Sequence, residues 1–291
     1  MTKRKDKLGS RGPRAAKGGA GGRPGSPPGG APGGPAARPR GGGRALWLFG
    51  VHAVLAALGN PNRRPERLLL TAEAAQAWGP RLREACDPRH AALATQTVQR
   101  RDIDALLPEG SVHQGLALAT APLAQPALED IFDRRLADPA PARRVVVLLD
   151  QVTDPHNVGA VLRSAAAFGA LAVVALDKGA PEESGTLAKA ASGAFEVVPY
   201  ISVVNLARAL DSLKDAGFWC LGLAGEARES LADSRPGEAV ALVLGAEGSG
   251  LRRLTRERCD VLVKLPTRPP IDSLNVSNAA AVALYELLGR A

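Results

Sequence analysis

The sequence predicts an α/β protein whose C-terminal half contains a parallel β-sheet covered by helices. From residue 145 to residue 288, short apolar runs rich in Val, Leu and Ala alternate with helix-like segments. Apolar runs of this kind are typical of strands buried on both faces, as crossover helices bury them in a parallel sheet. A shorter mixed segment precedes this part, and a Gly- and Pro-rich stretch precedes both. We therefore expect a tail, a small α/β domain and a larger parallel-sheet domain.

Residues 1–44 are expected to form a disordered basic tail. They contain eleven Lys and Arg and one acidic residue, a net charge of +10, whereas the other 247 residues carry 26 basic and 28 acidic side chains. Gly- and Pro-rich runs offer no apolar face to offset the chain entropy lost on ordering. A basic, unstructured arm indicates a polyanion as partner, although an inert solubilising terminus explains the composition equally well.

Residues 45–121 are expected to form the small α/β domain. The apolar run 46–58 is interpreted as one helix, ended by the Gly-Asn-Pro sequence at 59–61. The segments after it are interpreted as a strand at 67–70, a helix at 72–85 and a strand at 115–120. By itself this pattern fits a structural or dimerising module as well as a binding one.

The remaining chain is expected to be a linker followed by the parallel-sheet domain. Residues 122–143 are rich in Ala and Pro and are interpreted as the linker, with a short helix near 128–136. Residues 144–291 are interpreted as the larger domain. Its expected strands are 145–149, 171–176, 195–199, 218–223, 240–244 and 261–265, and its expected helices are 158–168, 186–192, 203–216, 251–259 and 274–288.

Composition narrows the class of protein. No run reaches the roughly 18 apolar residues of a membrane span, and no apolar signal-peptide core precedes residue 45. The three cysteines, Cys86, Cys220 and Cys259, are odd in number and widely spaced, which fits neither a disulfide framework nor a zinc motif. We therefore expect a reduced, cytoplasmic protein without a metal centre.

The first polar segment of the larger domain, residues 150–164, follows its first strand. Asn157 stands between a turn and a helix, so an N-cap role explains it. Arg163 lies farther along the same largely apolar helix. Because helical neighbours are three or four residues apart, Gly159 is expected to leave open space where a phosphate or ribose approaches Arg163. A salt-bridged surface arginine is the competing interpretation.

The second polar segment, residues 244–251, follows a buried strand and opens a helix. Its glycines do not form the G-x-G-x-x-G pattern, and the strand comes late in the alternation, so a nicotinamide enzyme is a weak alternative. The glycines allow a ligand to approach the backbone closely, and Glu247 is expected to project from the loop as a hydrogen-bond acceptor.

The third polar segment, residues 265–278, joins a strand to the last helix. Its two consecutive prolines stiffen the loop, and Asp272 or Ser273 is expected to cap the helix, with Asn275 in the first turn. A helix N-terminus has free N–H groups and a positive dipole end, which suit polar ligand atoms. The small residues Ala279–Ala281 next to it suit either core packing or a close helix contact across a dimer.

The three segments, in this order, resemble the signature motifs of the SpoU/TrmH family of RNA ribose 2'-O-methyltransferases in the SPOUT superfamily. Residues 221–227 resemble the family's further cofactor loop. Residues 49–54 and 112–115 resemble the RNA-recognition domain of its ribosomal-RNA subgroup, so the resemblance covers residues 46–291.

The resemblance implies a deep trefoil knot in the C-terminal domain, which general topology rules would not suggest. It implies S-adenosyl-L-methionine as methyl donor and a homodimer with the active site at the subunit interface. The catalytic residues it implies are Asn157, Arg163, Glu247 and Asn275, and the cofactor-binding residues are Ala224, Gly225, Gly245, Leu265, Ser273 and Leu274. Because a guanidinium stays protonated in proteins, we interpret Arg163 as a cation that binds phosphate rather than as a general base.

The resulting hypothesis is an S-adenosylmethionine-dependent enzyme that methylates the 2'-oxygen of a ribose, with a guanosine of large-subunit ribosomal RNA as target. Its partner would be ribosomal RNA or a pre-ribosomal particle. The first alternative is a transfer-RNA ribose 2'-O-methyltransferase. The second is a non-catalytic RNA-binding assembly factor, against which the polar residues of all three segments count.

Overall fold

The structure is a computed structural model that describes residues 46–132 and 143–289. The expected disordered tail at 1–44 and residues 133–136 of the expected linker helix lie outside the described residues. The linker residues that are described include one short 3-10 turn, Glu129–Ile131. The chain from Arg44 onward clusters as one compact unit, so the domain boundaries expected near 121 and 144 stay a prediction. We refer to residues 46–121 as the N-terminal module and residues 144–289 as the C-terminal module.

The N-terminal module contains one four-stranded sheet with strand order β1-β4-β2-β3. β4 pairs antiparallel with β1 and β2, while β2 pairs parallel with β3. Its elements are β1 (Leu46–Phe49), α1 (Val51–Gly59), β2 (Pro65–Leu70), α2 (Ala72–Ala85), β3 (Ala94–Thr97), α3 (Arg100–Asp104) and β4 (Leu116–Thr120). The strands expected at 67–70 and 115–120 and the helix expected at 72–85 are confirmed.

The single helix expected at 46–58 is wrong. Residues 46–49 form β1, which pairs with β4, and only residues 51–59 form a helix. Gly50 separates the two with a φ of +86°, a conformation that glycine adopts without strain. The apolar run 46–58 has no periodicity that would show where a strand ends and a helix begins. The strand is determined by its pairing with β4, for example of Leu48 with Leu118, which lies far away in the sequence. β3 was not expected because all four of its residues are exposed.

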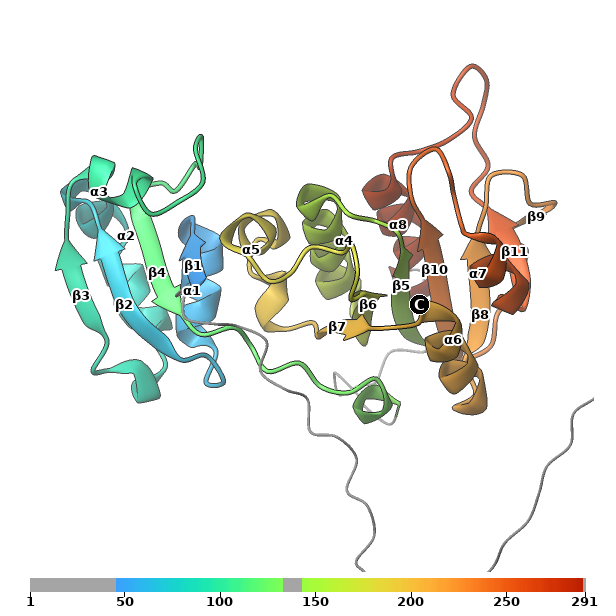
Figure 1. Cartoon of the computed structure of the whole chain (residues 1–291), viewed down its shortest axis with the longest axis horizontal. Helices are drawn as coiled ribbons and strands as arrows, with labels where there is room; N and C mark the ends of the chain where they lie inside the picture. The colour runs from blue at the N-terminus through green and yellow to red at the C-terminus, as the bar shows by residue number, and fades with distance from the viewer. Residues whose placement is uncertain (1–45, 133–142, 290–291) are drawn as a thin grey trace, which may run out of the picture. The chain divides into compact units, whose positions relative to one another are not determined.

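The C-terminal module contains a seven-stranded parallel sheet with strand order β7-β6-β5-β10-β8-β11-β9 (Figure 1). The parallel-sheet fold is thus as the sequence predicts. The strands are β5 (Arg144–Asp150), β6 (Ala172–Leu176), β7 (Tyr200–Val203), β8 (Trp219–Leu223), β9 (Glu229–Ser230), β10 (Ala239–Gly245) and β11 (Val261–Lys264). The helices are α4 (Pro155–Phe168), α5 (Gly185–Ala191), α6 (Leu206–Asp215), α7 (Arg253–Arg258) and α8 (Val276–Leu284), which continues as a π-helical turn (Tyr285–Gly289).

Helices cover both faces of this sheet. Alternate residues of a strand point to opposite faces, so Val145 and Val147 of β5 pack with α4, α5 and α8, whereas Val146 and Leu148 pack with α6 and with Leu251. Burial on both faces explains why the strands read as continuous apolar runs. The core therefore has two layers, one on each side of the sheet.

Three expected boundaries in this module are wrong. The helix expected from residue 158 begins already at Pro155, after its cap Asp154. The strand expected at 195–199 is instead the 3-10 turn Ala194–Glu196, and β7 begins only at Tyr200. Phe195 is apolar because it packs into the core from this turn, not because it belongs to a strand. The helix expected from residue 203 begins at Leu206, because Asn205 caps it by accepting hydrogen bonds from the amides of residues 207 and 208.

Among the described residues, no helix is long and apolar enough to cross a membrane.

Candidate active site

The three polar segments follow the carboxyl ends of β5, β10 and β11, on the same side of the sheet. β10 pairs with β5 in a register that places Gly245 opposite Asp150, β10 also pairs with β8, and β8 pairs with β11. The carboxyl ends of parallel strands lie together, and open α/β sheets bind ligands outside these ends. The strand order thus brings residues 150–157, 245–251 and 265–275 together.

Three side chains from these segments form one hydrogen-bonded cluster. The Nδ2 amide of Asn157 donates to Glu247 Oε1 at 2.9 Å, and the Nδ2 amide of Asn275 donates to the same oxygen at 2.6 Å. Asn275 Nδ2 also lies 3.0 Å from Asn157 Oδ1. No hydrogen bond to Glu247 Oε2 is found among the described residues. The cluster therefore presents an acceptor oxygen to a ligand.

Asn157 is free for this cluster because it does not cap α4. The N-cap is Asp154, whose carboxylate accepts the amide of His156 at 3.0 Å, so the expected capping role of Asn157 is wrong. Asn157 is the third residue of the helix, and its side chain points toward the neighbouring loop instead.

Asn275 is held in place by its own helix. It is the N-cap of α8, with Oδ1 accepting from the Ser277 amide at 2.9 Å and from the Ser277 hydroxyl at 2.5 Å. The expected caps, Asp272 and Ser273, are wrong. Because Ser277 occupies the oxygen of the Asn275 amide, the nitrogen faces Glu247.

The loop that carries Glu247 is a tight turn. Ala246 and Gly250 form an isolated antiparallel bridge, and the Gly250 amide donates to the Ala246 carbonyl at 2.9 Å. Gly248 and Gly250 have φ values of +79° and +65°, which favour glycine. A Cβ atom on Gly245 would lie 2.2 Å from the Gly250 carbonyl carbon. Gly245 is thus required by the protein's own backbone, whereas the sequence suggested close approach by a ligand.

An ion pair between the buried Asp150 and the half-exposed Arg252 fixes the far end of this loop. Asp150, at the end of β5, is fully buried and accepts from the backbone amide of Arg252 at 2.9 Å and from its Nε at 2.6 Å. The pair ties the segment after Glu247 to the strand before Asn157. Sequence reasoning missed it, although an acidic residue that ends an apolar strand was a visible signal.

Arg163 lies apart from the cluster. It is six residues beyond Asn157 on α4, which corresponds to about 9 Å along the helix and about 120° around it. Its side chain is exposed, and no ion pair or hydrogen bond of its guanidinium is found in the part of the chain that the structure describes. The salt-bridged interpretation is therefore not supported. The open space expected at Gly159 is wrong, because a Cβ there would lie 2.4 Å from Ala190 Cβ of α5.

The expected cofactor residues lie in loops at the ends of β8, β10 and β11. Ala224 is buried and its amide donates to the Val263 carbonyl at 2.9 Å, while a Cβ on Gly225 would lie 3.8 Å from the Asp272 carbonyl oxygen. The loop after β8 thus faces the loop after β11. Leu265 is half-buried, and Ser273 and Leu274 are exposed on the second of these loops.

Two other sequence features have structural explanations. His113 is fully buried, with Nε2 3.0 Å from Asp104 Oδ1 and Nδ1 accepting from the Gly115 amide at 3.1 Å, so it stabilises its own turn. Ala279 and Ala280 are buried within the C-terminal module, which selects core packing over a contact between subunits for these two positions.

Burial makes two of the three cysteines poor candidates for chemistry. Burial raises the pKa of Cys220 and Cys259 to about 12, so both are neutral thiols at physiological pH and poor nucleophiles. The described residues also contain no group of three or more His, Cys, Asp and Glu side chains placed to hold a metal ion.

The packing at Gly245 generates a prediction. Gly245→Ala should destabilise the folded protein by about 1–3 kcal/mol, because the new methyl group overlaps the backbone of residue 250. Chemical denaturation measures the effect. Gly237→Ala is the matched control, since a Cβ there meets nothing within 4 Å. Equal stability of the two variants would show that the turn opens at no cost.

The chain is similar to characterised proteins over most of its length. Residues 144–285 match the SpoU rRNA Methylase family, and residues 47–126 match the RNA 2'-O ribose methyltransferase substrate binding family. The 23S rRNA (guanosine-2'-O-)-methyltransferase RlmB of Pseudomonas putida is 39% identical over 248 residues, which cover 82% of this chain and 94% of that protein. RlmB of Xanthomonas campestris is 41% identical over 242 residues, with 82% and 94% covered.

Solved structures show the same fold. The SpoU methyltransferase AviRb from Streptomyces viridochromogenes, solved in complex with AdoMet, superposes with a TM-score of 0.69 at 21% identity and covers 84% of this chain and 90% of its own. A structure described as an RNA 2'-O ribose methyltransferase gives a TM-score of 0.64 at 26% identity, with 84% and 88% covered. Together with the relatives near 40% identity, these matches show that the chain belongs to the SpoU rRNA methylase family.

Proposed function

We propose that this protein transfers a methyl group from S-adenosylmethionine to the 2'-oxygen of a guanosine ribose in 23S ribosomal RNA. The RlmB relatives carry this activity in their names and are matched over 94% of their length. The observation that carries the proposal is the cluster of Asn157, Glu247 and Asn275, in which side chains from all three polar segments meet. An enzyme acting on ribosomal RNA would work in the cytoplasm, on the RNA or on an assembling particle.

The loops after β8, β10 and β11 fit S-adenosylmethionine. These strands are neighbours, so their loops form one continuous rim. The rim offers backbone groups near Ala224, Gly225 and Gly245 and apolar side chains from Leu265 and Leu274, with Ser273 between. The exposed side chain of Leu274 suits the face of an adenine ring. When bound, S-adenosylmethionine supplies an electrophilic methyl group on a sulfonium ion.

Methyl transfer to a ribose is an in-line displacement. The 2'-oxygen must therefore be aligned with the methyl–sulfur bond, and its O–H bond must be weakened by a hydrogen-bond acceptor. Glu247 Oε1 is occupied by the two amides, and we propose that Oε2 accepts the hydrogen bond of the 2'-hydroxyl. As the oxygen–methyl bond forms and the sulfur–methyl bond breaks, the same carboxylate oxygen would take the hydroxyl proton. Asn157 and Asn275 fix the carboxylate in that orientation. Arg163 contacts none of these side chains, so we assign it to a phosphate of the RNA, where its charge also stabilises the developing oxyanion.

The alternatives differ in substrate and in chemistry. A transfer-RNA ribose methyltransferase would need the same cluster but a different RNA. A non-catalytic assembly factor would keep the RNA-binding module and would not need the cluster. The relatives named above favour ribosomal RNA.

A direct experiment separates the three functions. The purified protein is incubated with S-adenosylmethionine and either transcribed 23S ribosomal RNA or total transfer RNA, and digested nucleosides are analysed by mass spectrometry. We expect 2'-O-methylguanosine from ribosomal RNA. Methylation of transfer RNA alone would support the first alternative, and RNA binding without cofactor binding in calorimetry would support the second.

We also propose that the C-terminal module is knotted. In the strand order, β11 lies outside β8, away from β5. After β11 the chain returns toward the middle of the sheet, where α8 packs with α4 and Asn275 contacts Asn157. Such a return supports a passage of residues 265–275 through the loop formed after β10. An experimental electron-density map that traces this segment outside the loop would contradict the knot.

The role of Arg163 generates a prediction. Arg163→Ala should lower the rate of methyl transfer about 10²- to 10³-fold while S-adenosylmethionine still binds, because the guanidinium acts on RNA and not on the positive sulfonium. Arg163→Lys should also be impaired, because lysine lacks the two-pronged geometry for phosphate. Single-turnover assays and calorimetry measure the two quantities.

Arg208→Ala is the control for this prediction. Arg208 is exposed on α6, which covers the other face of the sheet, and its loss should leave both quantities unchanged. Parallel losses of cofactor affinity and turnover in Arg163→Ala would contradict the assignment to RNA.

We further propose a homodimer through the exposed face of α8. Val282 and Tyr285 have exposed fractions of 48% and 51%, large for apolar side chains next to a candidate active site. Tyr285 also packs edge-on against Phe168 of α4, which extends the apolar surface toward the helix that carries Asn157 and Arg163.

The dimer generates its own prediction. Val282→Glu should produce monomers and lower activity, because a carboxylate placed in a close-packed interface loses its hydration without gaining a partner. Light scattering and methyl-transfer assays measure the outcome. Val204→Glu is the control, since Val204 is 86% exposed elsewhere. A Val282→Glu variant that stays dimeric would place the interface on another face.

A further inference from the structure

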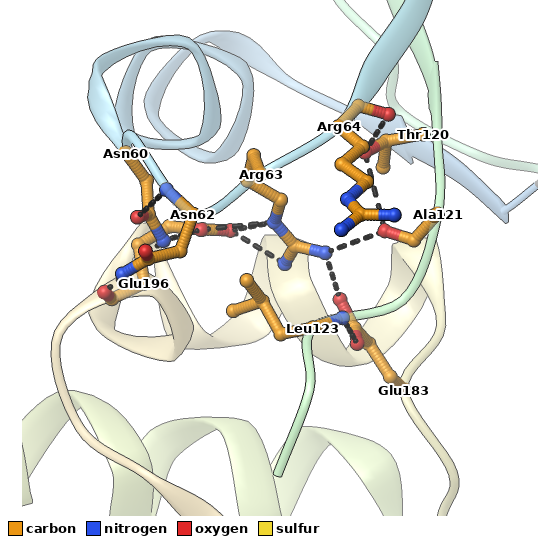
Figure 2. A network of polar contacts seen from close by, with 9 residues as sticks. All are labelled: Asn60, Asn62, Arg63, Arg64, Thr120, Ala121, Leu123, Glu183 and Glu196. Atoms are coloured by element: carbon orange, nitrogen blue, oxygen red, sulfur yellow. Dashed lines mark hydrogen bonds and ion pairs between the residues drawn. The ribbon is translucent and has the colours of Figure 1, made fainter. Parts of the chain in front are cut away.

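Arg63 of the N-terminal module is fully buried by acidic residues of the C-terminal module. Its Nη2 lies 2.6 Å from Glu196 Oε1, and its Nε donates to the same carboxylate at 2.9 Å (Figure 2). Its Nη1 lies 2.5 Å from Glu183 Oε1, an ion pair that lacks hydrogen-bond geometry. Asn60 adds a hydrogen bond from Nδ2 to Glu196 Oε2 at 2.7 Å. The exposed fractions of the three charged side chains are 0%, 5% and 4%.

In this cluster, which we call the Arg63 cluster, the anionic partners of the guanidinium that are found among the described residues both belong to the C-terminal module. A buried guanidinium without an anionic partner is strongly destabilising. Arg63 Nη1 also donates a hydrogen bond to the carbonyl of Ala121, at 3.2 Å, where the N-terminal module ends. The Leu123 amide, just beyond, donates to Glu183 at 2.8 Å, so the start of the linker belongs to the same arrangement.

Beside the Arg63 cluster, the start of α5 packs so closely against β1 that there is no room for a side chain at Gly185. Gly185, the first residue of α5, would place a Cβ 2.2 Å from the Trp47 carbonyl oxygen of β1. β1 is the outer strand of its sheet, so α5 covers an edge that would otherwise be open. Lys189 of α5 also donates to the Val112 carbonyl in the loop before β4. The N-terminal module thus contacts α5 through backbone and loop, and it contacts the acidic residues that flank α5, Glu183 and Glu196, through the Arg63 charge.

α5 in turn rests on the helix that carries the candidate catalytic residues. Gly159 of α4 faces Ala190 of α5 so closely that a Cβ would lie 2.4 Å from the Ala190 Cβ. Asn157 is two residues before Gly159. A continuous series of close backbone contacts therefore runs from β1 through α5 to α4, the helix that carries Asn157.

We propose that Arg63 is a positioning residue for methylation: by locking the N-terminal module onto α5, it sets the distance between RNA held by that module and the Glu247 carboxylate. The inference rests on the proposed function, because it assigns RNA binding to the N-terminal module. The lock, rather than the linker, determines how the substrate is presented. RNA that contacts two surfaces at a fixed spacing binds more tightly than RNA that must bring them together.

Two variants test the lock by independent routes. Arg63→Met removes the charge and keeps most of the apolar stem. Gly185→Ala leaves the Arg63 cluster intact but inserts a methyl group against β1, and because alanine is the better helix former, any opening reports on the contact with β1. Arg258→Met and Gly237→Ala are the controls, since Arg258 forms an exposed ion pair with Asp211 inside the C-terminal module and Gly237 has free space.

Both test variants should behave alike. Hydrogen exchange of residues 46–50 and 183–192 should accelerate, and the KM for 23S ribosomal RNA should rise about ten- to a hundredfold. Turnover at saturating RNA should stay within about twofold of the wild type, since the candidate catalytic cluster is untouched. The affinity for S-adenosylmethionine should not change, and both controls should match the wild type.

Each departure from this pattern contradicts the proposal. Faster exchange with an unchanged KM would show that the contact does not position RNA, and unchanged exchange would show that these residues do not hold it. Loss of cofactor affinity in both variants would mean that they disturb the C-terminal module itself. If the wild-type protein fails to methylate ribosomal RNA, the proposed function is wrong, while the exchange data still report on the lock.

Discussion

One oxygen atom, Glu247 Oε1, connects three segments that are distant in the sequence. It accepts an amide from Asn157, 90 residues earlier, and an amide from Asn275, 28 residues later. The rest of the candidate site depends on this arrangement, because the carboxylate is oriented only while both amides are in place. The second carboxylate oxygen is then directed by the protein rather than by solvent, which is the preorganisation that electrostatic catalysis requires.

The arrangement has several supports. Strand order places the ends of β5 and β10 side by side, Gly245 lets the turn fold back on itself, and buried Asp150 ties the end of that turn to β5. Ser277 fixes the orientation of the Asn275 amide. Each of these supports is a backbone contact or a polar interaction, and none is the packing of apolar side chains. The site is thus built into the sheet edge, while the Arg63 cluster connects it to the module expected to bind RNA.

The sequence predicted the parallel sheet better than it predicted the local structure of the polar loops. Short, continuous apolar runs between helices fit few structures other than the strands of a buried parallel sheet. The polar segments that follow these runs could also be recognised in the sequence. Asn157 and Asn275 were nevertheless assigned wrongly at the helix ends, because Asp154, Asp272 and Ser273 are equally good caps in a sequence pattern. Pairing between distant segments also escaped prediction: β1 depends on β4, and Arg63 depends on acids more than a hundred residues away.

The most direct test of the account is single-turnover methyl transfer to 23S ribosomal RNA by Glu247→Gln. Glutamine has one acceptor oxygen, so it cannot both hold the two amides and accept the 2'-hydroxyl. The account predicts a loss of about 10²- to 10³-fold in rate with S-adenosylmethionine binding retained, whereas the exposed Glu257→Gln leaves both unchanged. A Glu247→Gln protein that transfers methyl groups at the wild-type rate would contradict it.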